Sequence, residues 1–121
     1  MHALAAFALA PLLLAAGPSK APDLVVDCYL VQSSSVGLGQ FVRHLRVQPS
    51  RGVVSVSDGL RGGAPRFLGD GRLVTFDADR LVFDFASAGS SGRTEIDRRT
   101  GAFRYGDGRT VIQGTCQEGG A

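Results

Sequence analysis

Two cysteines are the residues of this chain whose chemistry is easiest to anticipate from their spacing. Cys28 lies early in the chain and Cys116 lies near its end. A redox-active pair would form a Cys-x-x-Cys motif, and a closed zinc site would need about four ligands, which these residues do not supply. A structural disulfide that closes a loop of nearly ninety residues is therefore predicted. The chain-entropy estimate of its stabilisation is roughly 4–5 kcal/mol.

Few other residues have the types and spacing that catalysis requires. His44 is the only histidine beyond residue 2, and Arg43 and Arg46 flank it, which is typical of an exposed strand residue. Asp77 and Asp79 lie in an expected turn, and turn chemistry explains them more simply than acid–base catalysis or calcium binding. We therefore expect no catalytic residue, no metal site and no cofactor.

A run of small residues from 86 to 92 partly matches a serine-hydrolase motif. The motif is Gly-x-Ser-x-Gly, and its last glycine would fall at position 93, where the chain has Arg93. We therefore predict an exposed loop at 86–92 and no nucleophile. The residues of this loop that are the best candidates for contact with a partner are Ser87, Ser90, Ser91 and Gly92.

The N-terminal segment has the character of a secretory signal peptide. Residues 1–16 read MHALAAFALAPLLLAA, an uncharged apolar run that is shorter than the roughly 20 residues of a membrane-spanning helix. Cleavage is expected after Ala16, and the composition of residues 17–22 predicts a linker. We expect the mature protein to have no membrane anchor and to be periplasmic or secreted, where disulfides persist.

The charge balance argues against nucleic acid as a partner. The chain has 13 Lys and Arg against 11 Asp and Glu, and its arginines are interspersed with acidic residues, whereas nucleic-acid binders concentrate them in a basic stripe. Arginine accounts for 12 of the 13 basic residues and asparagine is absent, a bias that indicates a GC-rich bacterial genome.

From residue 23 onward, apolar and polar residues alternate with the period of two that is typical of strands. We predict a single β-domain over 23–118, followed by a disordered tail at 119–121. Asp58-Gly59 ends an expected strand, 33–39 is expected to be a loop, and Asp70-Gly71 is a strong type I′ hairpin signal. The expected strands are 24–31, 41–47, 53–57, 66–69, 72–76, 80–85, 93–98, 102–105 and 109–117.

About eight short strands separated by turns, without crossover helices, favour an antiparallel meander that closes into a small barrel. A two-sheet sandwich is the alternative. Closure would place the first strand beside the last, and these two strands carry Cys28 and Cys116. Leu81, Phe83 and Phe85 form the most apolar strand face, whereas Arg43 interrupts the apolar face of the second strand.

The C-terminal third resembles a loose group of small exported bacterial proteins of unknown function. The resemblance is carried by an early cysteine, an Arg-x-Thr-Gly hairpin, an aromatic strand and a final Gly-x-Cys strand. The matching residues are Cys28, Arg98 or Arg99, Thr100, Gly101, Phe103, Gly114 and Cys116. The expected architecture is also similar to that of the periplasmic inhibitors of c-type lysozyme, which block the enzyme with a Ser/Gly-containing loop.

Three functional hypotheses follow. The first is a non-enzymatic domain that binds a protein or an envelope component. The second, implied by the architectural resemblance, is an inhibitor of a lysozyme-like hydrolase that acts through the loop at 87–92. The third is a carrier of a small apolar ligand in a barrel cavity lined by Leu81, Phe83 and Phe85.

Overall fold

A computed structural model of the chain describes residues 21–34, 37–59, 64–87 and 90–119. All regular structure in these ranges is β. The strands are β1 (Leu24–Ser34), β2 (Gly37–Gln48), β3 (Val53–Gly59), β4 (Arg66–Phe76), β5 (Arg80–Ser87), β6 (Ser90–Asp97), β7 (Ala102–Gly106) and β8 (Val111–Gly119). The expected signal peptide, and all of the expected linker before residue 21, lie outside the described residues.

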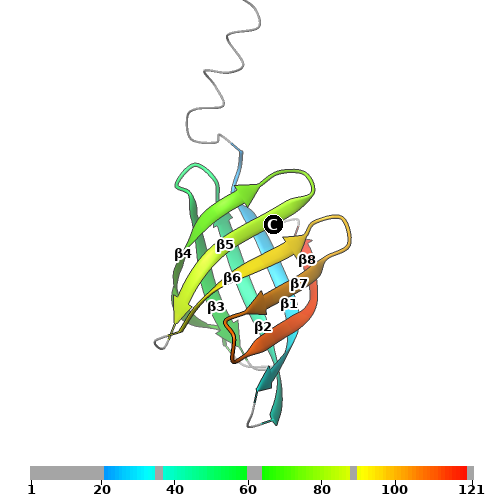
Figure 1. Cartoon of the computed structure of the whole chain (residues 1–121). Coiled ribbons are helices and arrows are strands. Elements are labelled where there is room, and N and C mark those ends of the chain that lie inside the picture. The colour runs from blue at the N-terminus through cyan, green and yellow to red at the C-terminus, as the bar shows by residue number, and fades with distance from the viewer. Residues whose placement is uncertain (1–20, 35–36, 60–63, 88–89, 120–121) are drawn as a thin grey trace, which may run out of the picture.

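The strands follow one another around a closed barrel in chain order, and each is antiparallel to the next. The prediction of a meander barrel is confirmed, and the sandwich alternative was wrong. We call the end at which β1 begins and β8 ends the upper end, as it is drawn in Figure 1, and the opposite end the lower end. The β1–β2 hairpin extends below the other strands at the lower end (Figure 1).

The barrel closes where β1 pairs with β8. This ladder runs from Val25 opposite Gly119 to Ser33 opposite Val111, so residue 119 is part of a strand and not of the expected tail. Cys28 lies directly opposite Cys116, and the two form a disulfide with a Cα–Cα distance of 4.0 Å. The predicted bridge and the predicted contact of the first and last strands are both confirmed.

Alternation along each strand turns every second side chain toward the barrel axis, where apolar residues pack together. Leu81, Phe83 and Phe85 are 1%, 0% and 5% exposed and belong to this core. Their side chains fill the interior at the position where the ligand hypothesis expected a cavity. The other buried members are Val26, Cys28, Leu30, Leu45, Val47, Val54, Val56, Ile96, Phe103, Tyr105 and Ile112.

The prediction of a hairpin at Asp70-Gly71 was wrong, because β4 runs straight through these residues. Gly71 is needed for packing and not for a turn. A Cβ atom there would lie 2.7 Å from the carbonyl oxygen of Asp84 and 3.0 Å from the ring of Phe83. The irregularity falls instead at a shift in the β3–β4 register near Gly69, whose φ is 149°.

Several strands are longer than predicted. The expected loops at 33–39 and 86–92 are mostly strand, since β1 and β2 meet at Ser34 and Gly37, and β5 and β6 meet at Ser87 and Ser90. Asp58-Gly59 is likewise part of β3. Runs of Ser, Gly and Ala carry no hydrophobic alternation, yet their backbone groups pair as well as any others.

We expect reduction of the Cys28–Cys116 bridge to destabilise the barrel by about 4 kcal/mol, because the open chain gains the freedom of an 88-residue separation. Urea denaturation of the same protein with and without a reductant measures this difference and leaves every other side chain unchanged. Equal midpoints for the two forms would contradict it. The double variant C28A/C116A, which has no bridge, should not respond to the reductant.

We expect Gly114→Ala to lower the free energy of unfolding by about 1–3 kcal/mol, because overpacking forces neighbouring groups apart at the β1–β8 closure. A Cβ atom at Gly114 would overlap the carbonyl oxygen of Tyr29 and crowd Leu30 across the β1–β8 ladder. Gly106→Ala is the matched control, because a Cβ atom there meets nothing within 4 Å. Denaturation midpoints that fall equally in both variants would contradict a steric constraint at Gly114.

Candidate functional site

The arrangement closest to a catalytic group is a row of three side chains on the outer surface. His44 lies opposite Asp27 on one side and opposite Ser57 on the other, so the register brings together the residue types of a serine-hydrolase triad. Nδ1 of His44 is 2.7 Å from Oδ1 of Asp27. Within the described ranges, however, His44 makes no hydrogen bond with Ser57, and the row lies on a convex face.

His44 therefore pairs with Asp27 on the outer face of the sheet. Its side chain is partly exposed, as the sequence pattern predicted. Over the same described ranges, no three His, Cys, Asp or Glu side chains are grouped as a metal site requires. None of the described residues forms a helix with the length and apolarity needed to cross a bilayer.

The acidic turn between β4 and β5 is stabilised by its own carboxylate. Oδ1 of Asp77 accepts the backbone N–H groups of Asp79 and Arg80 at 2.9 and 2.8 Å. These two hydrogen bonds favour the ionised form and lower the pKa of Asp77. The geometry supports the expected turn role of Asp77.

An arginine covers the core at the upper end. Nε and Nη2 of Arg98 donate to the two carboxylate oxygens of Glu118 at 2.7 and 3.0 Å, and Nη1 donates to the carbonyl oxygen of Asp77 at 2.6 Å. The guanidinium lies over the ring of Phe76, 4.6 Å from its centroid. The hydrogen bond from Arg98 lowers the pKa of Glu118 below its ordinary value. These contacts make Arg98 a structural residue.

A second arginine occupies the corresponding position toward the lower end. The side chain of Arg43 is 8% exposed, and it donates from Nε and Nη2 to the carboxylate of Asp58 at 2.7 and 2.8 Å. Its guanidinium also lies 5.4 Å from the ring centroid of Phe41 and 5.9 Å from that of Phe85. The arginine that interrupted an apolar pattern in the sequence is therefore buried on the apolar side and neutralised there.

The outer surface near the lower end carries a group of exposed apolar side chains, which we call the apolar face. Tyr29 is 53% exposed and Leu38 is 79% exposed. A groove of about 390 Å³ runs beside Tyr29 and is bordered by Gln40 and Val42. The apolar face consists of the exposed side chains of Tyr29, Val31, Leu38 and Val111 and the half-buried side chain of Val42, which lie on the adjoining strands β1, β2 and β8.

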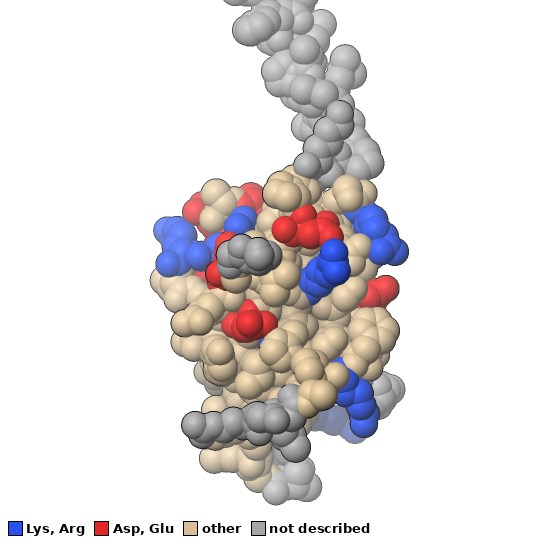
Figure 2. Space-filling view, turned by 180° about the vertical axis from the view of Figure 1, so that it is seen from behind, with Lys and Arg blue, Asp and Glu red and all other residues tan. Residues whose placement is uncertain are grey.

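Charge is distributed unevenly between the two sides of the barrel. The outer side of β4, β5 and β6 carries a network in which Asp84 accepts from both Arg72 and Arg93. These interactions lower the pKa of Asp84, and the hydrogen bond from Arg93 is the larger cause. Figure 2 views the opposite side, over β1, β2 and β3, where charged side chains gather toward the upper end and the edges. Its lower half is almost free of charge.

The predicted interaction loop is placed only in part. Ser91 and Gly92 lie in β6, where they pair with Ala86 and Phe85, and Ser87 pairs with Ser90 across the hairpin. Residues 88–89 lie outside the described residues. Gly92 faces the ring of Tyr105, which leaves no room for a Cβ atom, so this glycine has a packing role. Binding through this hairpin stays a prediction.

Sequence reasoning did not single out the apolar face as a site. The pattern placed Tyr29 and Val31 on the side of the first strand that faces away from the core, but it gave no neighbours for them. Only the register shows that Val42 lies beside Tyr29 and that Val111 lies beside Ser33. An outward-facing Tyr and Val on one strand were the available signal.

We expect Glu118→Gln to lower the stability by about 1 kcal/mol at pH 7, because one charge-assisted pairing with Arg98 is lost at a partly exposed position. The pKa of Glu118 is depressed in the folded state, so the ionised form stabilises the fold above the ordinary value of 4.5. This contribution is lost as the pH falls through the folded-state pKa. Denaturation curves of wild type and variant should therefore converge in acid.

Glu95→Gln is the matched control for this prediction. Glu95 pairs with Arg80 at 3.7 Å on the open surface, where an ion pair has little effect on stability. Its removal should change the unfolding midpoint much less at either pH. A difference between wild type and Glu118→Gln that stays constant from pH 7 to pH 3 would contradict the assigned role of the carboxylate.

Comparison with known proteins leaves the fold and the local chemistry as the basis for inference. No protein-family model, curated protein or solved structure matches this chain.

Proposed function

We propose that this chain is a non-enzymatic binding domain that acts after export from a bacterial cell and recognises another protein through its apolar face. The observation that carries the proposal is the unequal surface. Exposed apolar side chains on β1, β2 and β8 adjoin one another where charged side chains are few, whereas the opposite side carries a network of ion pairs.

The composition of the apolar face suits contact with a protein. Tyr29 has a large ring and a hydroxyl group, which are typical of binding surfaces, and Val31 follows it on the same face of β1 while Val42 lies opposite it on β2. The polar neighbours Gln40 and Gln113 can donate and accept hydrogen bonds without a charge to desolvate. A partner with an uncharged apolar surface fits this chemistry best.

The strands that carry the apolar face are held rigidly by the fold. The β1–β2 ladder continues without a shift from Leu24 opposite Val47 to Ser34 opposite Gly37, and the disulfide joins β1 to β8. The side chains of the apolar face are therefore held on a continuous sheet. A preorganised surface binds with a smaller loss of conformational entropy than a loop does.

The disulfide between Cys28 and Cys116 supports an oxidising compartment as the location of the domain. Disulfides persist in oxidising environments such as the bacterial periplasm and the exterior of the cell. We place the domain in one of these two locations.

We expect Val31→Asp to abolish capture of the partner, because it puts a charge on the apolar face beside Tyr29. Val74→Asp is a closely matched control, since Val74 and Val31 are both valines with 39% exposure and Val74 lies on β4. The immobilised wild type and both variants are incubated with an envelope extract of the source bacterium. The supporting result is a protein that wild type and Val74→Asp retain and Val31→Asp loses.

Affinity for the protein identified in this way is then measured with purified components. Val31→Asp should weaken binding at least tenfold, which corresponds to about 1.4 kcal/mol. Equal loss in both valine variants, or equal retention in both, would overturn the assignment of the apolar face. Circular dichroism and urea denaturation of the variants establish that each remains folded.

A further inference from the structure

The lower mouth of the barrel contains an open pocket that adjoins the groove beside Tyr29 at Phe41. Its volume is about 470 Å³, which is within the range of sites for small ligands. Residues from four neighbouring strands line it, together with Ala64, which lies just before β4. They are Gln32, Phe41, Asp58, Gly59, Ala64, Arg66 and Leu68.

The floor of the pocket is apolar. Phe41 and Leu68 are partly buried and pack against the hydrophobic core. Phe85 belongs to that core, and the guanidinium of Arg43 lies 5.9 Å from the centroid of its ring. A ligand in this pocket therefore contacts apolar side chains on its inner side and stops short of the filled interior.

The rim of the pocket carries an excess positive charge. Arg43 lies opposite Asp58 in the β2–β3 ladder, and Asp58 lies opposite Arg66 in the β3–β4 ladder. Both oxygens of the Asp58 carboxylate accept from Arg43, so this pair is neutral. Among the residues that the structure describes, Arg66 has neither an ion pair nor a side-chain hydrogen bond.

We propose that this mouth pocket binds a small amphiphile with one carboxylate, whose apolar body lies on Phe41 and Leu68 and whose carboxylate pairs with Arg66. The guanidinium presents two parallel N–H donors that match a carboxylate. The amide of Gln32 lies on the pocket wall and provides a further donor. The pocket favours an anion because Arg43 and Asp58 cancel each other and Arg66 does not.

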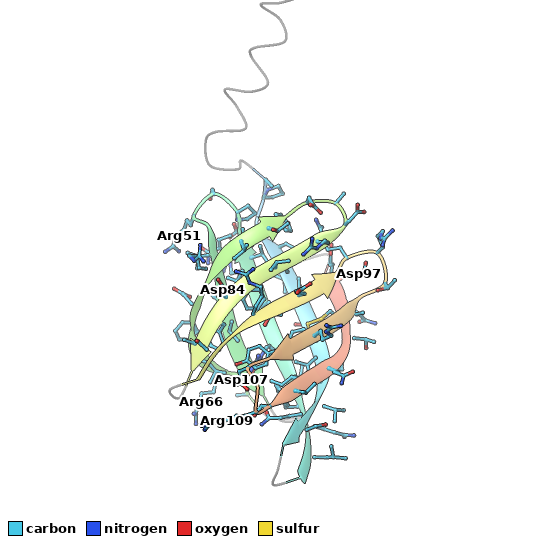
Figure 3. All side chains as sticks on the ribbon, viewed as in Figure 1. Arg51, Arg66, Asp84, Asp97, Asp107 and Arg109 are labelled. Atoms are coloured by element: carbon cyan, nitrogen blue, oxygen red, sulfur yellow. A yellow bond between two sulfur atoms is a disulfide. The ribbon has the colours of Figure 1, made fainter. Side chains whose placement is uncertain are left out.

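Figure 3 identifies a matched control for the charge. Arg66 lies at the lower end of the barrel, whereas Arg51 lies near the upper end. Arg51 is an exposed arginine that donates to the side chain of Gln48 at 2.7 Å. Replacement of either arginine by glutamine removes one positive charge from the molecule, but only Arg66→Gln changes the pocket.

The test is calorimetric titration of the mature protein with decanoate. Wild type and Arg51→Gln should bind one decanoate per chain, and Arg66→Gln should bind it at least tenfold more weakly. Decyltrimethylammonium, which has the same tail and the opposite charge, should also bind at least tenfold more weakly to wild type. No binding of decanoate, several molecules per chain, or equal weakening by Arg51→Gln would overturn the proposal.

A second variant tests the location without a change of charge. Ala64→Phe places a ring in the pocket and should block decanoate while Arg66 remains present. Shifts of the amide resonances on decanoate binding should concentrate at Gln32 and Leu68, and shifts centred on Phe83 in the core would contradict the pocket. This inference is independent of the proposed protein-binding function, because Val31→Asp leaves the pocket intact and should retain decanoate binding.

Discussion

Closure between β1 and β8 is the constraint on which the rest of the structure depends. An open meander of eight strands would leave two unpaired edges, and its inward side chains would not meet around a common axis. The ladder from Val25 to Ser33 removes both edges, and the Cys28–Cys116 bridge makes the closure covalent. Gly114 permits the close approach of the two backbones, because any side chain there would overlap Tyr29.

Closure also determines where polar groups can enter the interior. Arg98 with Glu118 covers the upper part of the core, and Arg43 with Asp58 covers the lower part, each beside an aromatic ring. Thr94 is the exception in the described core, since its buried hydroxyl has no hydrogen-bond partner there. Asp58 of the lower pair also lines the pocket at the lower mouth, whereas Arg98 of the upper pair is tied to the β4–β5 turn through the carbonyl oxygen of Asp77.

Much of the fold could be predicted from two features of the sequence. Period-two alternation is a local pattern that identifies strands, and the two cysteines indicate that the first and last strands are neighbours. The boundaries at Ser34, Gly37, Ser87 and Ser90 did not follow, since small residues pair through backbone groups without a hydrophobic signal. The candidate site was harder to predict. Pairing of Arg43 with Asp58, or of Val42 with Tyr29, depends on register between separate strands, which the sequence pattern does not encode.

The bridge has a mechanical consequence as well. The first and last strands are antiparallel neighbours, and the described chain enters and leaves the barrel at the same upper end. Tension applied through the two chain ends would therefore peel β1 away from β8 one pair at a time. Only the pairs Val25–Gly119, Val26–Glu118 and Asp27–Gln117 precede the cysteines, so the load would soon pass to a covalent bond. The barrel below the bridge would be shielded from force applied at its ends.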